Sequence, residues 1–450
     1  EWILPSTGEL SPARIARIIA SRIQLFHNSE AIKHRLTLLE EREESPRHQS
    51  ANFQRAPFFC SGCPHNVSTR VPKGSRVLAG IGCHYMAIWM DRSTNTFTHM
   101  GAEGVNWIGQ APFTDEKHVF VNLGDGTYYH SGILAVRQAV AAGVNVTFKI
   151  LYNDAVAMTG GQPIDGPLSV DRVSRQLAAE GVDCIFVVTD EPHKYPSGTN
   201  FAPGTKVHHR DELDRLQRDL RNHKGVSALI YDQTCAAEKR RRRKRGLYPD
   251  PAKRVVINEA VCEGCGDCSV ASNCLSVVPV ETEFGRKRTI DQSSCNKDYS
   301  CLNGFCPSFV TVHGGELRKP STADFDSSAG EFSAKLPTPQ LPILDQPYSI
   351  LITGIGGTGV VTIGALLAMA AHMEGKACSV LDITGLAQKG GAVTSHLRIG
   401  QAPEDLHATR IATGGAHVML GCDLVVAATS ESLTKVRAGI TRAVINSYEA

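Results

Sequence analysis

The fold of this chain is decided by two stretches, Val119-Phe-Val-Asn-Leu-Gly-Asp-Gly126 and Val146-Thr-Phe-Lys-Ile-Leu-Tyr-Asn-Asp-Ala155. Each is a nearly continuous apolar run that ends in glycine or polar residues. Similar runs at residues 183–188 and 226–231 follow segments with a helical pattern. Apolar strands that alternate with helices predict a parallel sheet covered by helices on both faces. We therefore expect an α/β domain over residues 55–245.

Polar residues follow the first two of these strands. Asp125 and Asn153 stand just after them, and the carboxyl ends of parallel strands share the sheet edge where ligands bind. Their oxygens suit Mg²⁺, which often shares phosphate oxygens with one or two side chains. The flanking Gly124 and Gly126 would let the backbone approach a diphosphate. A tight turn beside an unrelated Asn is the plainer interpretation of the same residues.

Gly-Asp-Gly followed by this Asn resembles the thiamine diphosphate signature. The resemblance implies that Asp125, the Asn153 side chain and the Ala155 carbonyl hold Mg²⁺. It also implies that the cofactor contacts glycines and polar residues around these ligands, namely Gly124, Gly126, Thr159, Gly160, Gly161 and Gln162.

Three cysteines stand near this site in the sequence, in Phe59-Cys60-Ser-Gly-Cys63-Pro-His65 and in Gly80-Ile-Gly-Cys83-His84. Two cysteines separated by two residues are able to bind one metal centre together. An iron–sulfur cluster, a zinc site and a buried structural pair are all compatible with this spacing.

Taken with the thiamine signature, these residues resemble the diphosphate-binding domain of 2-oxoacid:ferredoxin oxidoreductases. That family places a [4Fe–4S] cluster beside the thiamine, held by a Cys-x-x-Cys pair, a later Cys and one from the tail of the domain. The resemblance assigns the first three ligands to Cys60, Cys63 and Cys83, and Cys235 is our candidate for the fourth. Cys184 lies inside a predicted strand, so we expect it in the core.

The chain has 14 Cys, of which seven fall between Cys262 and Cys306. Clustered cysteines in a large α/β chain indicate metal ligation in a reducing compartment rather than a disulfide scaffold. We name residues 255–313 the Cys-rich segment and expect a small ferredoxin-like fold there. Zinc is the alternative metal.

In bacterial-type ferredoxins the Cys-Pro cysteine of each motif binds the cluster of the other motif. That crossing predicts one [4Fe–4S] site from Cys262, Cys265, Cys268 and Cys306. It leaves only Cys274, Cys295 and Cys301 for a second site. The cluster at that site uses a non-Cys ligand, is of another type, or is absent.

A second α/β domain is predicted over residues 348–450, where the strand Ser349-Ile-Leu-Ile-Thr precedes Gly354-Ile-Gly-Gly-Thr-Gly359 and a helix. With the later run Leu381-Asp-Ile-Thr-Gly-Leu-Ala-Gln-Lys-Gly-Gly-Ala-Val-Thr-Ser395, it resembles the Rossmann-like gamma domain of the same family. That domain does not normally bind NAD, so we reject NAD. The glycines serve packing, or they contact an anion or coenzyme A.

Three stretches are expected to connect these parts. Residues 1–54 read as a helix from Pro12, capped by Ser11, followed from Glu40 by linker, and they form the tail of a preceding domain. Residues 314–347 read as a linker. The basic run at 239–245 is a solvated connector or a docking patch for an acidic electron carrier.

The order of these modules resembles the fused indolepyruvate ferredoxin oxidoreductases of proteobacteria. The resemblance implies oxidative decarboxylation of an aryl 2-oxo acid, with transfer of the acyl group to coenzyme A and of electrons through clusters to ferredoxin. It also implies that this chain is an internal fragment, inactive alone, whose activating glutamate lies elsewhere in the polypeptide, and that the whole protein is a homodimer. A branched-chain 2-oxo acid is an alternative substrate.

Two other classes stay open at this point, a non-redox thiamine lyase or carboligase and a non-catalytic electron-transfer module. The net charge of +2 over 450 residues gives no reason to expect nucleic acid or membrane as a partner. With no long apolar run and no leader pattern, we expect a cytoplasmic location.

Overall fold

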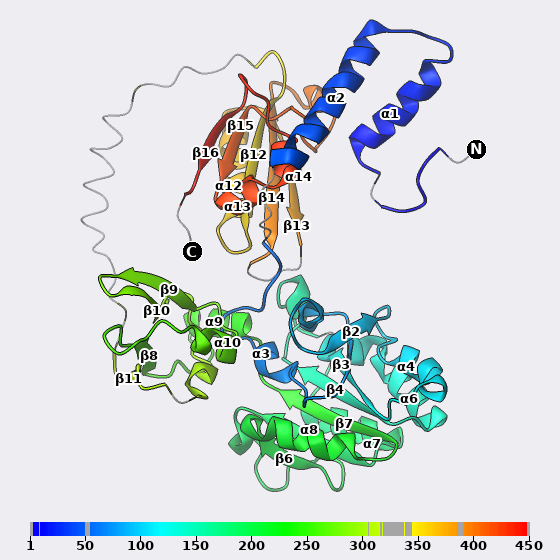
Figure 1. The fold of residues 1–450 in the computed structure, drawn as a ribbon, viewed down its shortest axis with the longest axis vertical. Helices are drawn as coiled ribbons and strands as arrows, with labels where there is room; N and C mark the ends of the chain where they lie inside the picture. The colour runs from blue at the N-terminus through cyan, green and yellow to red at the C-terminus, as the bar shows by residue number, and fades with distance from the viewer. Residues whose placement is uncertain are drawn as a thin grey trace. The chain divides into compact units, whose positions relative to one another are not determined.

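The computed structural model describes residues 3–8, 10–49, 55–164, 166–304, 306–315, 317, 337, 344–385 and 390–447. These residues form two compact units (Figure 1). One contains the described residues from 58 to 317, and the other contains those before 58 and from 337 onward. We describe each unit by itself.

The first unit is built on a seven-stranded sheet in which every neighbouring pair is parallel. Its order is β2-β1-β3-β4-β7-β5-β6. The strands are β1 (Val77–Ala79), β2 (Thr94–Phe97), β3 (Val119–Gly124), β4 (Val146–Tyr152), β5 (Cys184–Thr189), β6 (Lys206–His209) and β7 (Val226–Asp232). The predicted parallel sheet is confirmed, and the four predicted strands match to within one residue at each end.

Helices cover both faces of this sheet because its strands are apolar on both sides. Along β7, Ala228 and Ile230 pack on one face and Leu229 and Tyr231 on the other. The first face is covered by α4 (Val105–Gln110), α6 (Ile133–Ala142) and α7 (Val170–Ala179), and the second by α3 (His65–Ser68) and α8 (Leu213–Arg221). The carboxyl edge of the sheet stays open for ligands.

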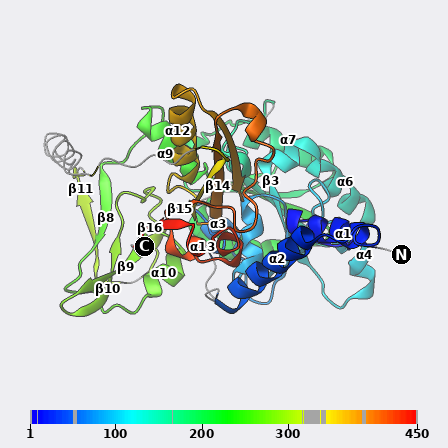
Figure 2. The ribbon, with the colours of Figure 1, turned by 90° about the horizontal axis from the view of Figure 1, so that it is seen from above.

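The Cys-rich segment contains two small antiparallel pairs, β8 (Lys253–Ile257) with β11 (Phe309–His313) and β9 (Val277–Thr282) with β10 (Gly285–Ile290). The pairs lie side by side in both views (Figures 1 and 2). Helix α10 (Asp267–Ser272) completes this part, and α9 (Ala236–Lys244) precedes it. Its small core consists of Val255, Ile257, Cys262, Val277 and Ile290, with four further cysteines among the side chains packed against it.

The second unit contains a five-stranded mixed sheet of order β13-β14-β12-β15-β16. Its elements are β12 (Tyr348–Ile355), α12 (Val360–Met373), β13 (Ala377–Thr384), β14 (Ala392–Gly400), β15 (Val418–Gly421), α13 (Leu424–Ala427), α14 (Ser430–Leu433) and β16 (Arg442–Ile445). The predicted strand–glycine–helix turn is confirmed. The likeness to a Rossmann fold is local, because β14 runs antiparallel between β12 and β13.

The N-terminal residues form α1 (Pro12–Ile23) and α2 (Glu30–Gln49). Ser11 caps α1, as predicted, by accepting a hydrogen bond from the Arg14 amide at 3.3 Å. The prediction of linker from Glu40 is wrong as far as Gln49. Residues 39–44 are strong helix formers, and Glu43 pairs with Arg17 of α1 at 3.0 Å.

Several predicted features fall outside the described residues. They are residues 50–54, most of the linker at 314–347, and residues 386–389 of the run quoted for the second α/β domain. Within the described part, none of the helices is both long and apolar enough to cross a membrane.

Candidate active site and cysteine groups

Asp125 organises the carboxyl edge of the first sheet. It follows β3, and its Oδ1 accepts a hydrogen bond from the Gly126 amide at 2.9 Å. Its Oδ2 accepts from the amides of Asn153 at 2.8 Å and Asp154 at 3.0 Å, which follow β4. The two predicted ligands therefore lie together. Burial raises the pKa of Asp125 to about 7, although these backbone amides oppose the rise. A cation beside the carboxylate would favour its charged form.

The amide oxygen of Asn153 also favours a cation at this edge of the sheet. This Oδ1 is buried and has no hydrogen-bond partner among the described residues, which is unusual for a buried polar atom. The carbonyl of Ala155 accepts from the Ala157 amide at 2.9 Å and keeps a second lone pair. A carboxylate, an unpartnered amide oxygen and a carbonyl are the oxygen ligands that Mg²⁺ prefers, so these residues fit the ion.

These groups open onto a cavity of 670 Å³, a volume typical of ligand sites. Thr159 and Gln162 lie in its wall and hydrogen-bond to each other, with 2.8 Å between Oγ1 and Oε1. Gly160 makes the left-handed turn between them, at φ +118°. Gly161 lines a neighbouring cavity instead, and a Cβ there would lie 2.2 Å from Glu238 of α9.

His84 restricts the space at two glycines of this region. A Cβ atom at Gly82 or Gly124 would lie 2.5 or 3.1 Å from the imidazole ring, whereas at Gly80 it would first meet the Asn122 carbonyl oxygen, at 2.0 Å. Sequence reasoning assigned Gly124 to the diphosphate, whereas the structure shows that it also makes room for this ring. The ring is buried, its Nε2 has no partner among the described residues, and burial lowers its pKa to about 3.

Sequence reasoning gave no role to His84 or to His65, which packs edge-on against it at 5.6 Å between ring centroids. Both line the 670 Å³ cavity. Burial also lowers the pKa of His65, to about 4, so both rings are neutral at pH 7. The available signal was their position, since each directly follows a Cys-Pro or Cys of the quoted motifs.

Four cysteines converge beside this cavity, and we name Cys60, Cys63, Cys83 and Cys235 the proximal group. They line one small neighbouring cavity. Burial, then the nearby Cys60, Cys235 and Cys83, raises the pKa of Cys63 well above its ordinary value. Burial, then Cys235 and Cys60, raises the pKa of Cys83 to about 12. Thiols that resist ionisation need a bound cation to become thiolates, and four thiols around one cavity fit a metal centre.

Cys235 enters this group from the N-terminus of α9. Burial raises the pKa of its thiol, and hydrogen bonds from the backbone amides of Glu238 and Ala237 oppose that rise. Cys184 stands apart at the start of β5, packed with the core of the second face, as expected.

The seven cysteines of the Cys-rich segment fall into two sets. Those that line a cavity of 330 Å³ are named the outer group: Cys262, Cys265, Cys268 and Cys306. The other three are named the three-thiol group: Cys274, Cys295 and Cys301. Burial, and then the nearby Cys274, raises the pKa of Cys295, and burial, Cys274 and Cys295 raise the pKa of Cys301. Cys301 also borders the outer cavity. The crossing pattern expects the same division, which stays a prediction because Cys301 borders both groups.

The basic run at 239–245 forms most of α9 and ends one residue beyond it. Lys239 pairs with Asp190 at 2.9 Å, and Arg242 pairs with Asp154 at 2.6 Å. Arg243 donates to the carbonyl of Asn296 in the Cys-rich segment at 2.7 Å. These three charges join parts of the first unit, whereas Arg241, Lys244 and Arg245 are exposed, so the docking of an acidic carrier stays a prediction.

Two family models match the chain. Residues 80–230 match the thiamine pyrophosphate enzyme family, C-terminal TPP binding domain. Residues 349–450 match the pyruvate ferredoxin/flavodoxin oxidoreductase family. The two matches fall on the two α/β sheets described above.

Curated relatives carry related names. The chain is 26% identical over 289 residues to indolepyruvate oxidoreductase subunit IorA of Thermococcus kodakarensis, covering 58% of this chain and 41% of the relative. It is 37% identical over 75 residues to subunit IorB of Archaeoglobus fulgidus, covering 17% and 35%. The chain thus spans about two fifths of the length of the IorA relatives.

Among solved structures, a 2-oxoglutarate:ferredoxin oxidoreductase from Magnetococcus marinus matches 42% of this chain and 67% of its own, at 18% identity and a TM-score of 0.30. The two family models and the IorA and IorB relatives agree with the thiamine signature of the sequence. Together, these matches support a place for the chain among the thiamine pyrophosphate-dependent 2-oxoacid:ferredoxin oxidoreductases.

Proposed function

We propose that this chain provides the diphosphate half of the active site and the electron path of an oxidoreductase that decarboxylates an aryl 2-oxo acid of the indolepyruvate type. One observation carries the proposal. The 670 Å³ cavity and the cavity of the proximal group share part of their walls, namely His65, Cys83, Asn153 and Ala157. A cofactor in the first and a cluster in the second would be neighbours.

Each set of residues has a stated role in this proposal. Asp125, Asn153 and the Ala155 carbonyl hold Mg²⁺ and so fix the diphosphate. The proximal, outer and three-thiol groups hold iron–sulfur clusters, of the [4Fe–4S] type where four thiolates are present. Thiamine diphosphate supplies the decarboxylation chemistry when bound.

In this proposal the residues around the cavity orient the cofactor and substrate and exclude water. His65 and His84 are neutral, so they present hydrogen-bonding edges without adding positive charge near the clusters. Coenzyme A accepts the acyl group, and ferredoxin receives electrons beside Cys265 and Cys306, the two exposed thiols of the outer group. The remainder of the polypeptide supplies the activating glutamate, and the whole protein acts as a homodimer.

The competing classes leave specific features without a role. A non-redox thiamine lyase gives none to the proximal group. A pure electron-transfer module gives none to the unpartnered Asn153 Oδ1. The aryl substrate is supported by the similarity to indolepyruvate oxidoreductase subunits IorA and IorB, and a branched-chain 2-oxo acid is the second candidate.

Two measurements on the full-length protein test the proposal. Iron and acid-labile sulfide analysis should find both, and fully active protein without iron would refute the redox assignment. A panel of aryl, branched-chain and small 2-oxo acids, assayed with coenzyme A and a viologen acceptor, should favour indolepyruvate. A higher kcat/KM for branched-chain acids would select the second substrate.

A further inference from the structure

Asp298 occupies the position in the sequence where a fourth ligand is missing. It lies three residues after Cys295 and three before Cys301. The outer group has its middle cysteine, Cys265, at the equivalent place between Cys262 and Cys268. Spacing alone therefore marks Asp298 as a carboxylate ligand for the three-thiol group.

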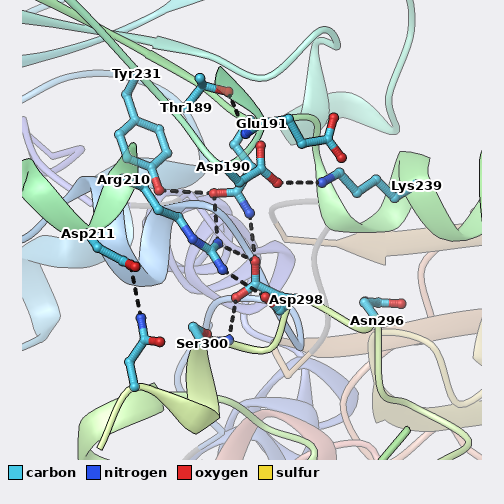
Figure 3. A network of polar contacts seen from close by, with 12 residues as sticks. Thr189, Asp190, Glu191, Arg210, Asp211, Tyr231, Lys239, Asn296, Asp298 and Ser300 are labelled. Carbon is cyan, nitrogen blue, oxygen red and sulfur yellow. Dashed lines mark hydrogen bonds and ion pairs between the residues drawn. The ribbon is translucent and has the colours of Figure 1, made fainter. Parts of the chain in front are cut away.

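In the structure, however, the Asp298 carboxylate is engaged in an ion pair and a hydrogen bond. Oδ1 of Asp298 lies 2.6 Å from Nη1 of Arg210 and accepts a hydrogen bond from Nε2 of Gln233 at 2.6 Å. Arg210 Nη2 also donates to the Asp298 carbonyl at 2.7 Å. Figure 3 shows the guanidinium and the carboxylate facing each other. We name Arg210, Gln233 and Asp298 the latch.

The latch joins two parts of the first unit. Arg210 follows β6 and Gln233 follows β7, so both belong to the large sheet, whereas Asp298 belongs to the Cys-rich segment. Tyr231 of β7 holds Gln233 through a hydrogen bond of 2.9 Å. The Arg210 and Asp298 side chains are only 10% and 7% exposed. A buried pair of this kind tolerates little displacement, because separating it leaves charges without partners.

The loop between Cys295 and Cys301, which carries Asp298, also contacts the loop that carries Cys60 and Cys63. Asn296 Nδ2 donates to the carbonyl of Ser61 at 2.7 Å. A Cβ at Gly62 would lie 2.8 Å from Cβ of Asp298, and Gly62 itself has a left-handed φ of +65°. The segment between Cys295 and Cys301 thus packs directly against the segment between Cys60 and Cys63.

We propose that Asp298 is a positioning residue rather than a cluster ligand: the latch holds the three-thiol group against the proximal group, so that electrons pass from one to the other. This rests on the proposed iron–sulfur function of both groups. The three-thiol group then contributes three cysteine ligands and no carboxylate.

The test compares Asp298→Asn with Arg210→Gln in the full-length, cluster-loaded protein. If the latch positions the clusters, both variants keep the iron and sulfide content and the spectrum of each cluster. Both lose the spin–spin interaction between reduced clusters in electron paramagnetic resonance, and both slow electron exit in a single turnover without slowing the first reduction. Arg218→Gln, which breaks the exposed pair with Asp214 on α8, is the control and should change nothing.

Arg210→Lys keeps the positive charge and should recover part of the spin–spin interaction. This recovery would distinguish a loss of cluster positioning from general misfolding of the variant. Removing one partner of a buried pair should also raise protease cleavage of the Cys-rich segment, on the order of tenfold to a hundredfold. If Asp298→Asn alone changes the iron content or one cluster spectrum, Asp298 is a ligand and the proposal fails. It also fails if neither variant alters the interaction. Protein without iron in the wild type refutes the proposed function instead.

Discussion

The backbone amide of Cys235 donates a hydrogen bond to the carbonyl of Asn153 at 2.9 Å. The side chain of the same Asn153 lies in the wall of the 670 Å³ cavity. One residue thus connects the candidate Mg²⁺ site to the proximal group, through its side chain on one side and its backbone on the other. A cofactor at the first site and a cluster at the second would therefore be linked by a backbone contact, which a substitution of the Asn153 side chain by alanine keeps.

Asn153→Ala should therefore separate the two sites. It removes the Oδ1 ligand but keeps the carbonyl that contacts Cys235. We expect Mg²⁺-dependent thiamine diphosphate affinity to fall roughly 10- to 100-fold, as for loss of a contact to a charged group, with no change in iron content. Titration calorimetry and iron analysis measure the two. Asn95→Ala, at an exposed position of β2, is the control, and a parallel loss of iron would contradict the separation.

Cys235→Ser and Cys184→Ser should behave differently although both residues are cysteines near strand ends. Cys235 lies among the proximal thiols, whereas Cys184 packs in the core. The first change should lower iron and sulfide content and remove one cluster signal, because serine is a poor replacement for a thiolate ligand. The second should leave both quantities unchanged. Iron loss in the Cys184 variant would show that the proximal group is wrongly assigned.

Gly82→Ala should be destabilising through His84. Its Cβ would lie 2.5 Å from the imidazole, and overpacking of this kind costs about 1–3 kcal/mol. His84→Ala should relieve most of that cost in the double variant, which a double-mutant cycle on urea unfolding measures. Gly109→Ala, in α4 with open space around it, should be neutral or slightly stabilising. Additive effects at positions 82 and 84 would refute the packing explanation.

The sequence allowed prediction of what depends on local pattern. The strands before Asp125 and Asn153 follow from apolar runs, and the outer and three-thiol groups follow from spacing. The linker assigned from Glu40 failed because α2 continues to Gln49. Features that depend on distant residues were not predictable: nothing near Asp298 in the sequence indicates Arg210, and nothing in the basic run indicates that Arg242 pairs with Asp154.

The stability of the large sheet should fall on acidification through His118. Its Nε2 lies 2.7 Å from Oγ1 of Thr147, which lies 2.8 Å from Oγ of Ser227. Burial, and then the charges of Arg221 and His223, lowers the pKa of His118 to about 4. The unfolded chain, with an ordinary value near ~6.5, binds the proton first. Stability from this group is therefore complete above pH ~6.5, falls as the pH drops toward 4 and changes no further below, by up to about 3 kcal/mol.

His118→Gln removes that proton linkage while keeping a polar side chain for Thr147. The variant should be less stable at pH 7, and its free energy of unfolding should depend less steeply on pH between 6.5 and 4 than that of the wild type. Urea unfolding followed by fluorescence of Trp107, which is buried on the opposite face of the same sheet, measures both. Because the other buried histidines titrate equally in the two proteins, the difference in slope isolates His118. Parallel curves over this range would show that His118 is protonated alike in the folded and unfolded chains.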